Sequence, residues 1–404
     1  MQELMNEIRQ EVVSQIDLYK DYKDEEIIEV IDEVILEKSR QVYINLNDKN
    51  QLNKNIFNSI RKLDVLQELI EDPSITEIMI NGADKIFIER DGAISSWDKK
   101  FESNKKLEDV IQQIASKSNR IINEANPIVD ARLSDGSRVN IVLPPISLSG
   151  ATVTIRKFPD KPISIKKLIE FGSLNKELAD FLEELVVARY NIFISGGTGS
   201  GKTTFLNVLS NYIPKDERVL NIEGSGEIQI KNVPNIVRLE VRNANMEGKN
   251  GISIRDLIKS ALRMRPDRIV VGEVRDAAAI DMLQAMNSGH DGSLSTGHAN
   301  SAVDMLNRLE TLVLMGMDIP LAAVRKQIVS AIDIIVHLGR LRDKTRKVIE
   351  VSEVLDCIDG QYILNKLYTF EEKGEDEKGS VIGQIVKSDK ELVNNMKLRK
   401  AGIL

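Results

Sequence analysis

The chain has 404 residues, of which 42% are hydrophobic and 29% are charged, and its formal net charge is −7. This length predicts two or three domains rather than one core, and the acidic balance argues against a non-specific nucleic-acid binder. A single cysteine, Cys357, rules out an internal disulfide and suits a reducing compartment. The apolar runs are strand-sized and the first residues lack a signal peptide's apolar core, so we expect a cytoplasmic protein that reaches the membrane only through a partner.

The first part of the chain predicts a helical segment followed by a mixed domain. Residues 1–55 are rich in charge and carry apolar residues at helical spacing, which predicts a small helical appendage. In residues 56–157, helices alternate with short strands, and Asn81-Gly82 and Asp91-Gly92 are typical of hairpin turns, which indicates an α/β domain. Two prolines in residues 158–163 keep the chain extended and predict a linker.

The second part predicts a larger α/β domain over residues 164–344 and a C-terminal extension over residues 345–404. In the larger domain, strands that alternate with helices are predicted at residues 191–195, 218–223, 236–241, 268–272 and 293–296. This alternation predicts a mostly parallel sheet with its ligand at the carboxyl ends of the strands. In the extension we expect antiparallel strands and a basic helix, at residues 348–355, 361–364, 367–370 and 389–404.

A phosphate-binding loop follows the first strand of the larger domain. Residues 196–203 satisfy G-x-x-x-x-G-K-[ST], and their glycines let backbone N–H groups surround phosphate oxygens at the start of a helix. In this motif, Lys202 reaches the β- and γ-phosphates and the Thr203 hydroxyl ligates Mg²⁺. The residues predicted to hold the nucleotide are Gly197, Thr198, Gly199, Ser200, Gly201, Lys202, Thr203 and Thr204. The flanking strand and helix favour ATP and Mg²⁺ binding over a glycine-rich turn without a ligand.

Further polar residues lie at strand ends of the same domain. Glu273 closes an apolar strand, where an acid would hold Mg²⁺ through water or orient the attacking water. His298 ends the next predicted strand, where it would meet the γ-phosphate or a catalytic water, although a packing role is more common for such a histidine. Glu223 adds a third polar residue at this edge, while Arg238 and Arg242 are equally compatible with surface ion pairing.

These segments, in this order, resemble the pilus-assembly and secretion ATPases of the CpaF/TadA group, within the type II/IV secretion motor superfamily. The resemblance covers roughly residues 60–355. The matching stretches are residues 72–82, 129–138, 195–204, 261–275 and 281–300. The long stretches are far more specific than the phosphate loop alone.

The resemblance implies a hexameric, Mg²⁺-dependent ATPase whose subunits pair an N-terminal PAS-like α/β domain with a RecA-like P-loop domain. It assigns a Walker A, an Asp box, a Walker B and a His box to residues 195–204, 218–229, 268–275 and 290–300. Arg138 and Arg156 match N-terminal-domain arginines that reach the phosphates. Arg238 and Arg242 match arginines that sense nucleotide at the subunit boundary. A guanidinium suits these roles because its rigid fork of donors neutralises transition-state charge.

One position departs from the pattern of the family. The Asp box carries Gly224 where an aspartate is expected, which puts Mg²⁺ affinity or the rate of hydrolysis in question. Glu223 is retained, and the sequence leaves open whether Glu223 or Glu273 is the base, with both kept as catalytic candidates and Glu273 also as a metal ligand.

The leading hypothesis is a cytoplasmic homohexameric ATPase that powers Flp/Tad-type pilus assembly or a related type II/IV secretion apparatus, with an integral membrane platform protein as its partner. Gly224 motivates a second hypothesis, an ATP-binding regulatory subunit that hydrolyses weakly. A third, a RecA-like nucleic-acid translocase, is disfavoured by the acidic balance and by an aromatic content of 4%. The basic run at residues 340–347 would suit a membrane partner, although a solvated turn is the commoner origin of such a run.

Overall fold

The computed structural model describes residues 2–16, 20, 22–90, 92–158, 162–224, 226–242 and 250–404. The chain divides into two compact units, Met1–Asp160 and Lys161–Leu404. The predicted linker at residues 158–163 spans this division, but its residues 159–161 lie outside the described residues. Among the described residues, no helix is long and apolar enough to cross a membrane.

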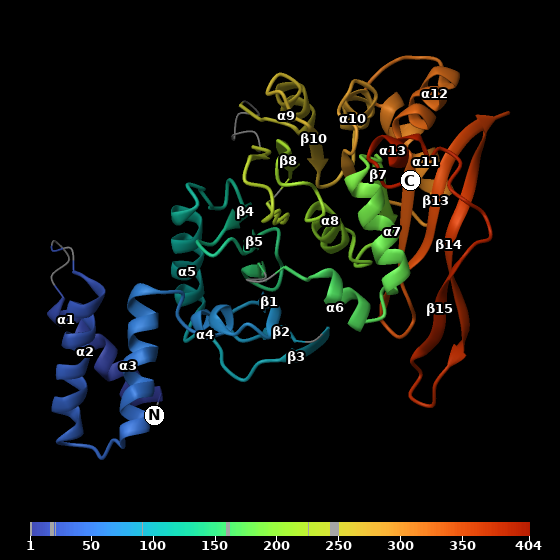
Figure 1. The fold of residues 1–404 in the computed structure, drawn as a ribbon. Coiled ribbons are helices and arrows are strands. Elements are labelled where there is room, and N and C mark those ends of the chain that lie inside the picture. Colours follow the sequence, from blue (N-terminus) through green and yellow to red (C-terminus); the bar gives the residue numbers. More distant parts are fainter. Residues whose placement is uncertain are drawn as a thin grey trace. The chain divides into compact units, whose positions relative to one another are not determined.

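The first unit begins with three helices, α1 (Gln2–Gln15), α2 (Asp24–Ser39) and α3 (Leu46–Arg61) (Figure 1). The Asn45 side chain caps α3 by accepting a hydrogen bond from the Asp48 N–H, which satisfies one of the free donors of the first turn. The three helices enclose a core of their own, made of Ile8, Val12, Ile27, Ile31, Val34, Ile35, Leu52 and Ile56. The third helix continues past residue 55, at which the sequence predicts the first domain boundary.

The rest of the first unit is an antiparallel sheet with two helices packed on it. Its strands are β1 (Ile75–Asn81), β2 (Ile86–Arg90), β3 (Ala93–Ser96), β4 (Ile128–Arg132), β5 (Arg138–Val142) and β6 (Thr152–Arg156), in the spatial order β3-β2-β1-β6-β5-β4. The helices are α4 (Leu66–Glu71) and α5 (Asn104–Lys117), whose buried leucines, isoleucines and valines share one core with the sheet. Alternating burial along β1 and β5 reflects a sheet with one covered face.

The second unit is built on a nine-stranded sheet. Its strands are β7 (Ile192–Gly196), β8 (Val219–Glu223), β9 (Ile236–Glu240), β10 (Arg268–Val271), β11 (Leu294–His298), β12 (Ile334–Arg340), β13 (Arg346–Ile358), β14 (Gln361–Glu375) and β15 (Val381–Lys387). The spatial order is β15-β14-β13-β12-β7-β11-β10-β8-β9. Strands from β12 to β9 are parallel, and those from β12 to β15 pair antiparallel. The long β13–β15 strands are the red-orange ribbons of Figure 1.

Helices cover both faces of this sheet. One core joins the sheet to α6 (Ile165–Glu170), α7 (Lys176–Val187), α8 (Lys202–Ser210) and α13 (Met396–Lys400). A second core joins it to α9 (Ile254–Ala261), α10 (Ala278–Asn287), α11 (Ala302–Leu314) and α12 (Leu321–Ala331). The central strand β7 is therefore buried along its whole length, as expected for a parallel strand between two helical layers.

The C-terminal part differs from the sequence prediction in two places. The two strands predicted at residues 361–364 and 367–370 form one strand, because Asn365 between them is buried and donates to Glu353 across the sheet. The helix predicted over residues 389–404 is confined to α13. The segment before α13 is not helical, and the N–H groups of Val393 and Asn394 donate to the same Glu353 carboxylate.

Candidate nucleotide site

The phosphate loop leaves β7 in a conformation that requires glycine. A Cβ on Gly196 would lie 2.5 Å from the carbonyl oxygen of Leu338 on β12, so no side chain fits there. Gly199 and Gly201 have φ values of +72° and +92°, which disfavour any L-residue. Ser200 is buried and donates to the carbonyl of Gly197 at 2.9 Å. The loop is therefore specified by steric and backbone requirements, and Gly197, Thr198 and Gly199 remain exposed at its surface.

The loop opens directly into α8. Gly201 caps this helix without any side-chain hydrogen bond, so the first-turn N–H groups and the positive end of the helix dipole are available to an anion. Lys202, Thr203 and Thr204 occupy this first turn. Lys202 is 7% exposed, and its ammonium donates to the carbonyl of Gly197 at 2.8 Å, which folds the side chain back over the loop.

Three predicted residues meet beside the loop. The Lys202 ammonium lies 3.3 Å from Nδ1 of His298, and Nε2 of His298 lies 3.1 Å from Oε1 of Glu273. Arg275 donates to the other oxygen of Glu273 at 2.6 Å. The strands β11 and β10 are hydrogen-bonded neighbours, which brings His298 and Glu273 together at their carboxyl ends. The expected grouping of Lys202, Glu273 and His298 is thus present in the geometry.

The charges of this cluster determine which nitrogen of His298 carries the proton. Burial lowers the pKa of His298, and the Lys202 ammonium lowers it further, while Glu273 opposes both. Burial also lowers the pKa of Lys202, with the Glu273 carboxylate opposing it. Because an ammonium only donates, Nδ1 of a neutral His298 must accept from Lys202. The imidazole proton then lies on Nε2, facing Glu273.

The carboxylate of the other acidic candidate, Glu223, is hydrogen-bonded to groups of the same chain. It is buried at the end of β8, where its carboxylate accepts from the side chain of Asn221 and from the N–H groups of Glu227 and Ile228, the latter two at 2.6 and 2.8 Å. Burial raises the pKa of Glu223 despite these hydrogen bonds. A Cβ on Gly272, the residue before Glu273, would lie 3.2 Å from Cγ of Glu223. Glu223 is thus next to the Glu273 strand, but it organises the loop that follows β8.

Arg238 and Arg242 lie apart from the Lys202 cluster. Arg238 is on β9, the edge strand of the sheet, and donates to the carbonyl of Ile230 at 3.0 Å. Arg242 follows β9, and its Nε donates to the carbonyl of Asn250 at 2.7 Å. Four strand spacings separate β9 from β7, or about 19 Å. Within this chain they therefore do not reach the phosphate loop.

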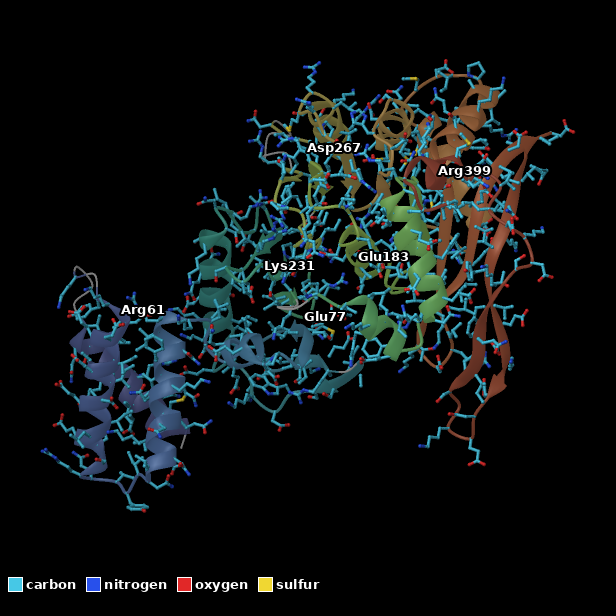
Figure 2. The ribbon with its side chains drawn as sticks, in the orientation of Figure 1. Arg61, Glu77, Glu183, Lys231, Asp267 and Arg399 are labelled. Atoms are coloured by element: carbon cyan, nitrogen blue, oxygen red, sulfur yellow. The ribbon has the colours of Figure 1, made fainter. Side chains whose placement is uncertain are left out.

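Arg138 and Arg156 belong to the first unit. They are directly paired across β5 and β6, so their side chains share one face of the antiparallel sheet. The same row continues to Arg132 on β4 and to Glu77 on β1, which is labelled in Figure 2. Burial raises the pKa of Glu77, and Glu89 raises it further while Arg156 lowers it. The row thus gathers three guanidinium groups on adjacent strands.

Two side chains at the site were not predicted from the sequence. His337, buried on β12, lies with Nδ1 at 2.8 Å from Oγ of Ser195, immediately before the phosphate loop. Its signal in the sequence is a histidine within the apolar run 334–338. Glu227 interacts electrostatically with Arg275, and it brings a further carboxylate to the surroundings of Glu273.

The donor set suits a magnesium ion that is held partly by the substrate. Among the described residues, no three His, Cys, Asp or Glu side chains gather into a metal cage. Mg²⁺ instead keeps several waters and binds through one or two protein oxygens plus phosphates. Oε1 of Glu273 is buried without an aligned hydrogen-bond donor among the described residues, and Thr203 lies in the first turn of α8. These two residues therefore fit the predicted metal ligands.

Comparison with known proteins identifies the family. The model of a family described as type II/IV secretion system protein matches residues 59–381. A conjugal transfer protein TrbB from Rhizobium radiobacter is 34% identical, over 73% of this chain and 90% of its own length. A type IV secretion system protein VirB11 from Bartonella quintana is 31% identical, over 74% of this chain and 94% of its own length.

A solved structure supports the fold. The crystal structure of the pilus retraction motor PilT with bound ADP superposes with a TM-score of 0.51 at 18% identity, over 84% of this chain and 87% of that one. The predicted fold class, an α/β protein with a RecA-like core behind an N-terminal domain, is confirmed. Together, the family match and the relatives show that the chain belongs to the type II/IV secretion system protein family.

Proposed function

We propose that this chain hydrolyses ATP in the presence of Mg²⁺ and uses the energy as a motor of a type II/IV secretion or Flp/Tad-type pilus apparatus. The observation that carries the proposal is the Lys202–His298–Glu273 cluster beside a glycine-built phosphate loop. A phosphate-binding loop with an acid and a neutral histidine at adjacent strand ends provides the groups that phosphoryl transfer to water requires.

The residues divide the chemistry between them. Lys202 and the N–H groups of the loop would bind the β- and γ-phosphates, and Thr203 with Glu273 would hold Mg²⁺. When bound, Mg²⁺ would neutralise charge that develops on the phosphate oxygens. Glu273 carries an oxygen without an aligned donor among the described residues, so it can accept a hydrogen bond from the attacking water. Arg275, which donates to the other oxygen of Glu273, would hold the carboxylate in place, and the neutral His298 would lie beside it.

We further propose that the working form is a ring, with six subunits as the resemblance implies. Arg238 and Arg242 on the edge of the sheet cannot serve the phosphate loop of their own chain, but an edge is suited to present them to the site of a neighbour. Arg138 and Arg156 would supply further cations from the first unit. The expected partner is an integral membrane platform protein, through which a cytoplasmic ring would be held at the inner face of the membrane.

The first test is steady-state MgATP hydrolysis by the full chain over a range of protein concentrations, with Lys202→Ala as the blank. Turnover per chain should rise steeply with concentration if sites are completed between subunits. Turnover equal to that of the blank at every concentration, in a chain that binds ATP, would contradict the hydrolase. In the host, Lys202→Ala should also abolish pilus or secretion output, and normal output would contradict the motor.

A mixing experiment tests the ring. Lys202→Ala and Arg242→Ala should each be inactive as single species, because one lacks the phosphate loop lysine and the other the arginine offered to a neighbour. Mixed in equal amounts, they should regain part of the activity, since some boundaries then pair an intact loop with an intact arginine. A mixture with no more activity than either variant would contradict action between subunits.

A second candidate function is an ATP-binding regulatory subunit of the same apparatus. The observation in its favour is that the Glu223 carboxylate is occupied by three hydrogen bonds in a box where Gly224 supplies no acid. Under this view the chain would bind MgATP tightly and turn it over slowly at all concentrations. Among the residues that the structure describes, no observation favours the nucleic-acid translocase.

A further inference from the structure

Two arginines lie against the outside of the phosphate loop. Arg340 ends β12 and Arg346 begins β13, and the two are directly paired across these strands. Nε of Arg346 donates to the carbonyl of Gly199 at 2.9 Å. Its Cδ lies 3.4 Å from the position of a Cβ on Gly201. The Arg346 side chain thus crosses two glycine positions of the loop.

The second guanidinium lies beside the first. Nη1 of Arg340 lies 3.6 Å from the position of a Cβ on Gly199, which is exposed. The Arg340 side chain is exposed and makes no ion pair or hydrogen bond with the described residues. Gly199 therefore has one arginine bonded to its carbonyl and a second next to its α-carbon.

Two further cations of the basic run 340–347 have other partners. Arg342 is paired with Glu372 and Glu375 on β14, and Lys347 donates to the carbonyl of Gly172 at 2.8 Å. These contacts hold the turn between β12 and β13 in place. Within the run, Arg340 and Arg346 are the arginines that contact the loop.

The side of the loop on which they lie indicates what they would contact. Arg340 and Arg346 are on β12 and β13, on one side of β7 in the sheet, whereas His298 ends β11 and Glu273 follows β10, on the other side of β7. The terminal phosphates belong at Lys202, beside His298 and Glu273. A nucleotide bound in this direction carries its base past the loop, away from that cluster.

We infer that Arg340 and Arg346 form the wall of the site that contacts the base of the nucleotide. A planar guanidinium stacks on an aromatic ring and is attracted by its π-face, and two of them side by side present such a surface. The expected ligand class is a nucleoside triphosphate that is held by its base as well as by its phosphates. This inference rests on the proposed function, because it requires that a nucleotide binds at Lys202.

The test compares two ligands, ATP and inorganic tripolyphosphate, each with Mg²⁺, by calorimetry on the full chain. Tripolyphosphate carries the phosphates without the base. The variant Arg340→Ala should bind ATP about tenfold more weakly, because it removes part of the stacking surface and no hydrogen bond to the loop, and should bind tripolyphosphate as the wild type does. Equal loss for both ligands, or no loss for either, would overturn the inference.

Two further variants separate stacking from charge and from folding. Arg346→Lys keeps a positive donor for Gly199 but has no planar group, so it should weaken ATP binding and spare tripolyphosphate. Arg342→Ala removes a cation of the same turn that does not touch the loop and should change neither affinity. A wild-type chain that binds neither ligand would contradict the proposed function itself. A wild-type chain that binds both ligands, with arginine variants whose affinities for ATP and tripolyphosphate change equally or not at all, would contradict only the contact between these arginines and the base.

Discussion

Oγ of Ser195 lies 2.8 Å from Nδ1 of His337, which ties the last residue before the phosphate loop to the neighbouring parallel strand. Both side chains are buried. Burial lowers the pKa of His337, and Lys202 lowers it further, against the opposing charges of Glu350 and Asp304. A neutral imidazole therefore supports the loop at pH 7, and protonation would place a charge beneath it.

This pair predicts a pH dependence of stability. His337 binds fewer protons in the folded chain than in the unfolded one, so the free energy of unfolding falls as the pH drops below about 6.5, the unperturbed value. His337→Asn keeps a polar partner for Ser195 and should make this fall shallower. Urea unfolding between pH 5 and 8 measures it, with His290→Asn as the control. Equal slopes for wild type and His337→Asn would contradict the prediction.

The cluster predicts opposite pKa changes at His298 in two variants. Glu273 raises the pKa of His298, whereas Arg275 lowers it. Glu273→Gln should therefore lower the pKa of His298 further, and Arg275→Gln should raise it. NMR titration suits the question because the chain has three histidines. A shift in the same direction in both variants would contradict the geometry. Glu273→Gln should also reduce turnover by at least about a hundredfold while ATP still binds.

The Gly224→Asp substitution in the Asp box should distinguish the two candidate functions. A Cβ on Gly224 would meet no atom within 4 Å, so the substitution is sterically tolerated. If the chain is a weakly hydrolysing regulatory subunit, the added carboxylate should raise turnover sharply. If it is a competent motor, turnover should change little. Steady-state hydrolysis measures the outcome, and Gly224→Asn, which adds the same bulk without charge, is the matched control.

Substitutions in the arginine row of the first unit should reduce ATP hydrolysis without unfolding the chain. Arg138→Ala and Arg156→Ala each remove one of two paired guanidinium groups. Both variants should keep the melting temperature within a few degrees and lose most of their turnover. Arg90→Ala, which removes an exposed partner of Asp72 on the same sheet, is the control. Unchanged turnover in both row variants would contradict the proposed role of these arginines.

The buried ion pair of Arg268 and Glu217 predicts an asymmetric loss of stability. Arg268 is fully buried, and its Nη2 donates to Glu217 at 2.8 Å. Glu217 is also paired with Arg189 at 3.3 Å. Glu217→Gln leaves the buried Arg268 without its charged partner and should lower the free energy of unfolding in urea by about 3–5 kcal/mol. Arg268→Met leaves Glu217 with Arg189 and should cost less. The reverse order would contradict this account.

The parallel core was predictable because its signals are local. The strands around residues 191–195 and 218–223 are short apolar runs that end at polar residues, and the phosphate loop is a motif with a steric cause at Gly196. Helices on both faces of the sheet follow from the alternation of strands and helices along the chain. The grouping of Lys202, Glu273 and His298 follows as well, because carboxyl ends of neighbouring parallel strands meet at one edge.

The remaining features depend on contacts between residues far apart in the chain. Asn365 looks like a strand break in the sequence, and only its distant partner Glu353 makes it a buried strand residue. His337 and Arg346 reach the phosphate loop from strands more than a hundred residues later. No spacing pattern reports such pairs, which is why the sequence identified the loop but not the side chains that support it.

The continuous hydrogen bonding from β7 through β12 to β15 determines where the chain can be shortened. Because β13 pairs along the whole of β12, a chain that stopped after Arg340 would leave β12 as a bare edge beside the phosphate loop. Unpaired N–H and C=O groups on such an edge recruit other strands. A core cut at that point would therefore aggregate, so the C-terminal strands are part of the folding unit that carries the phosphate loop.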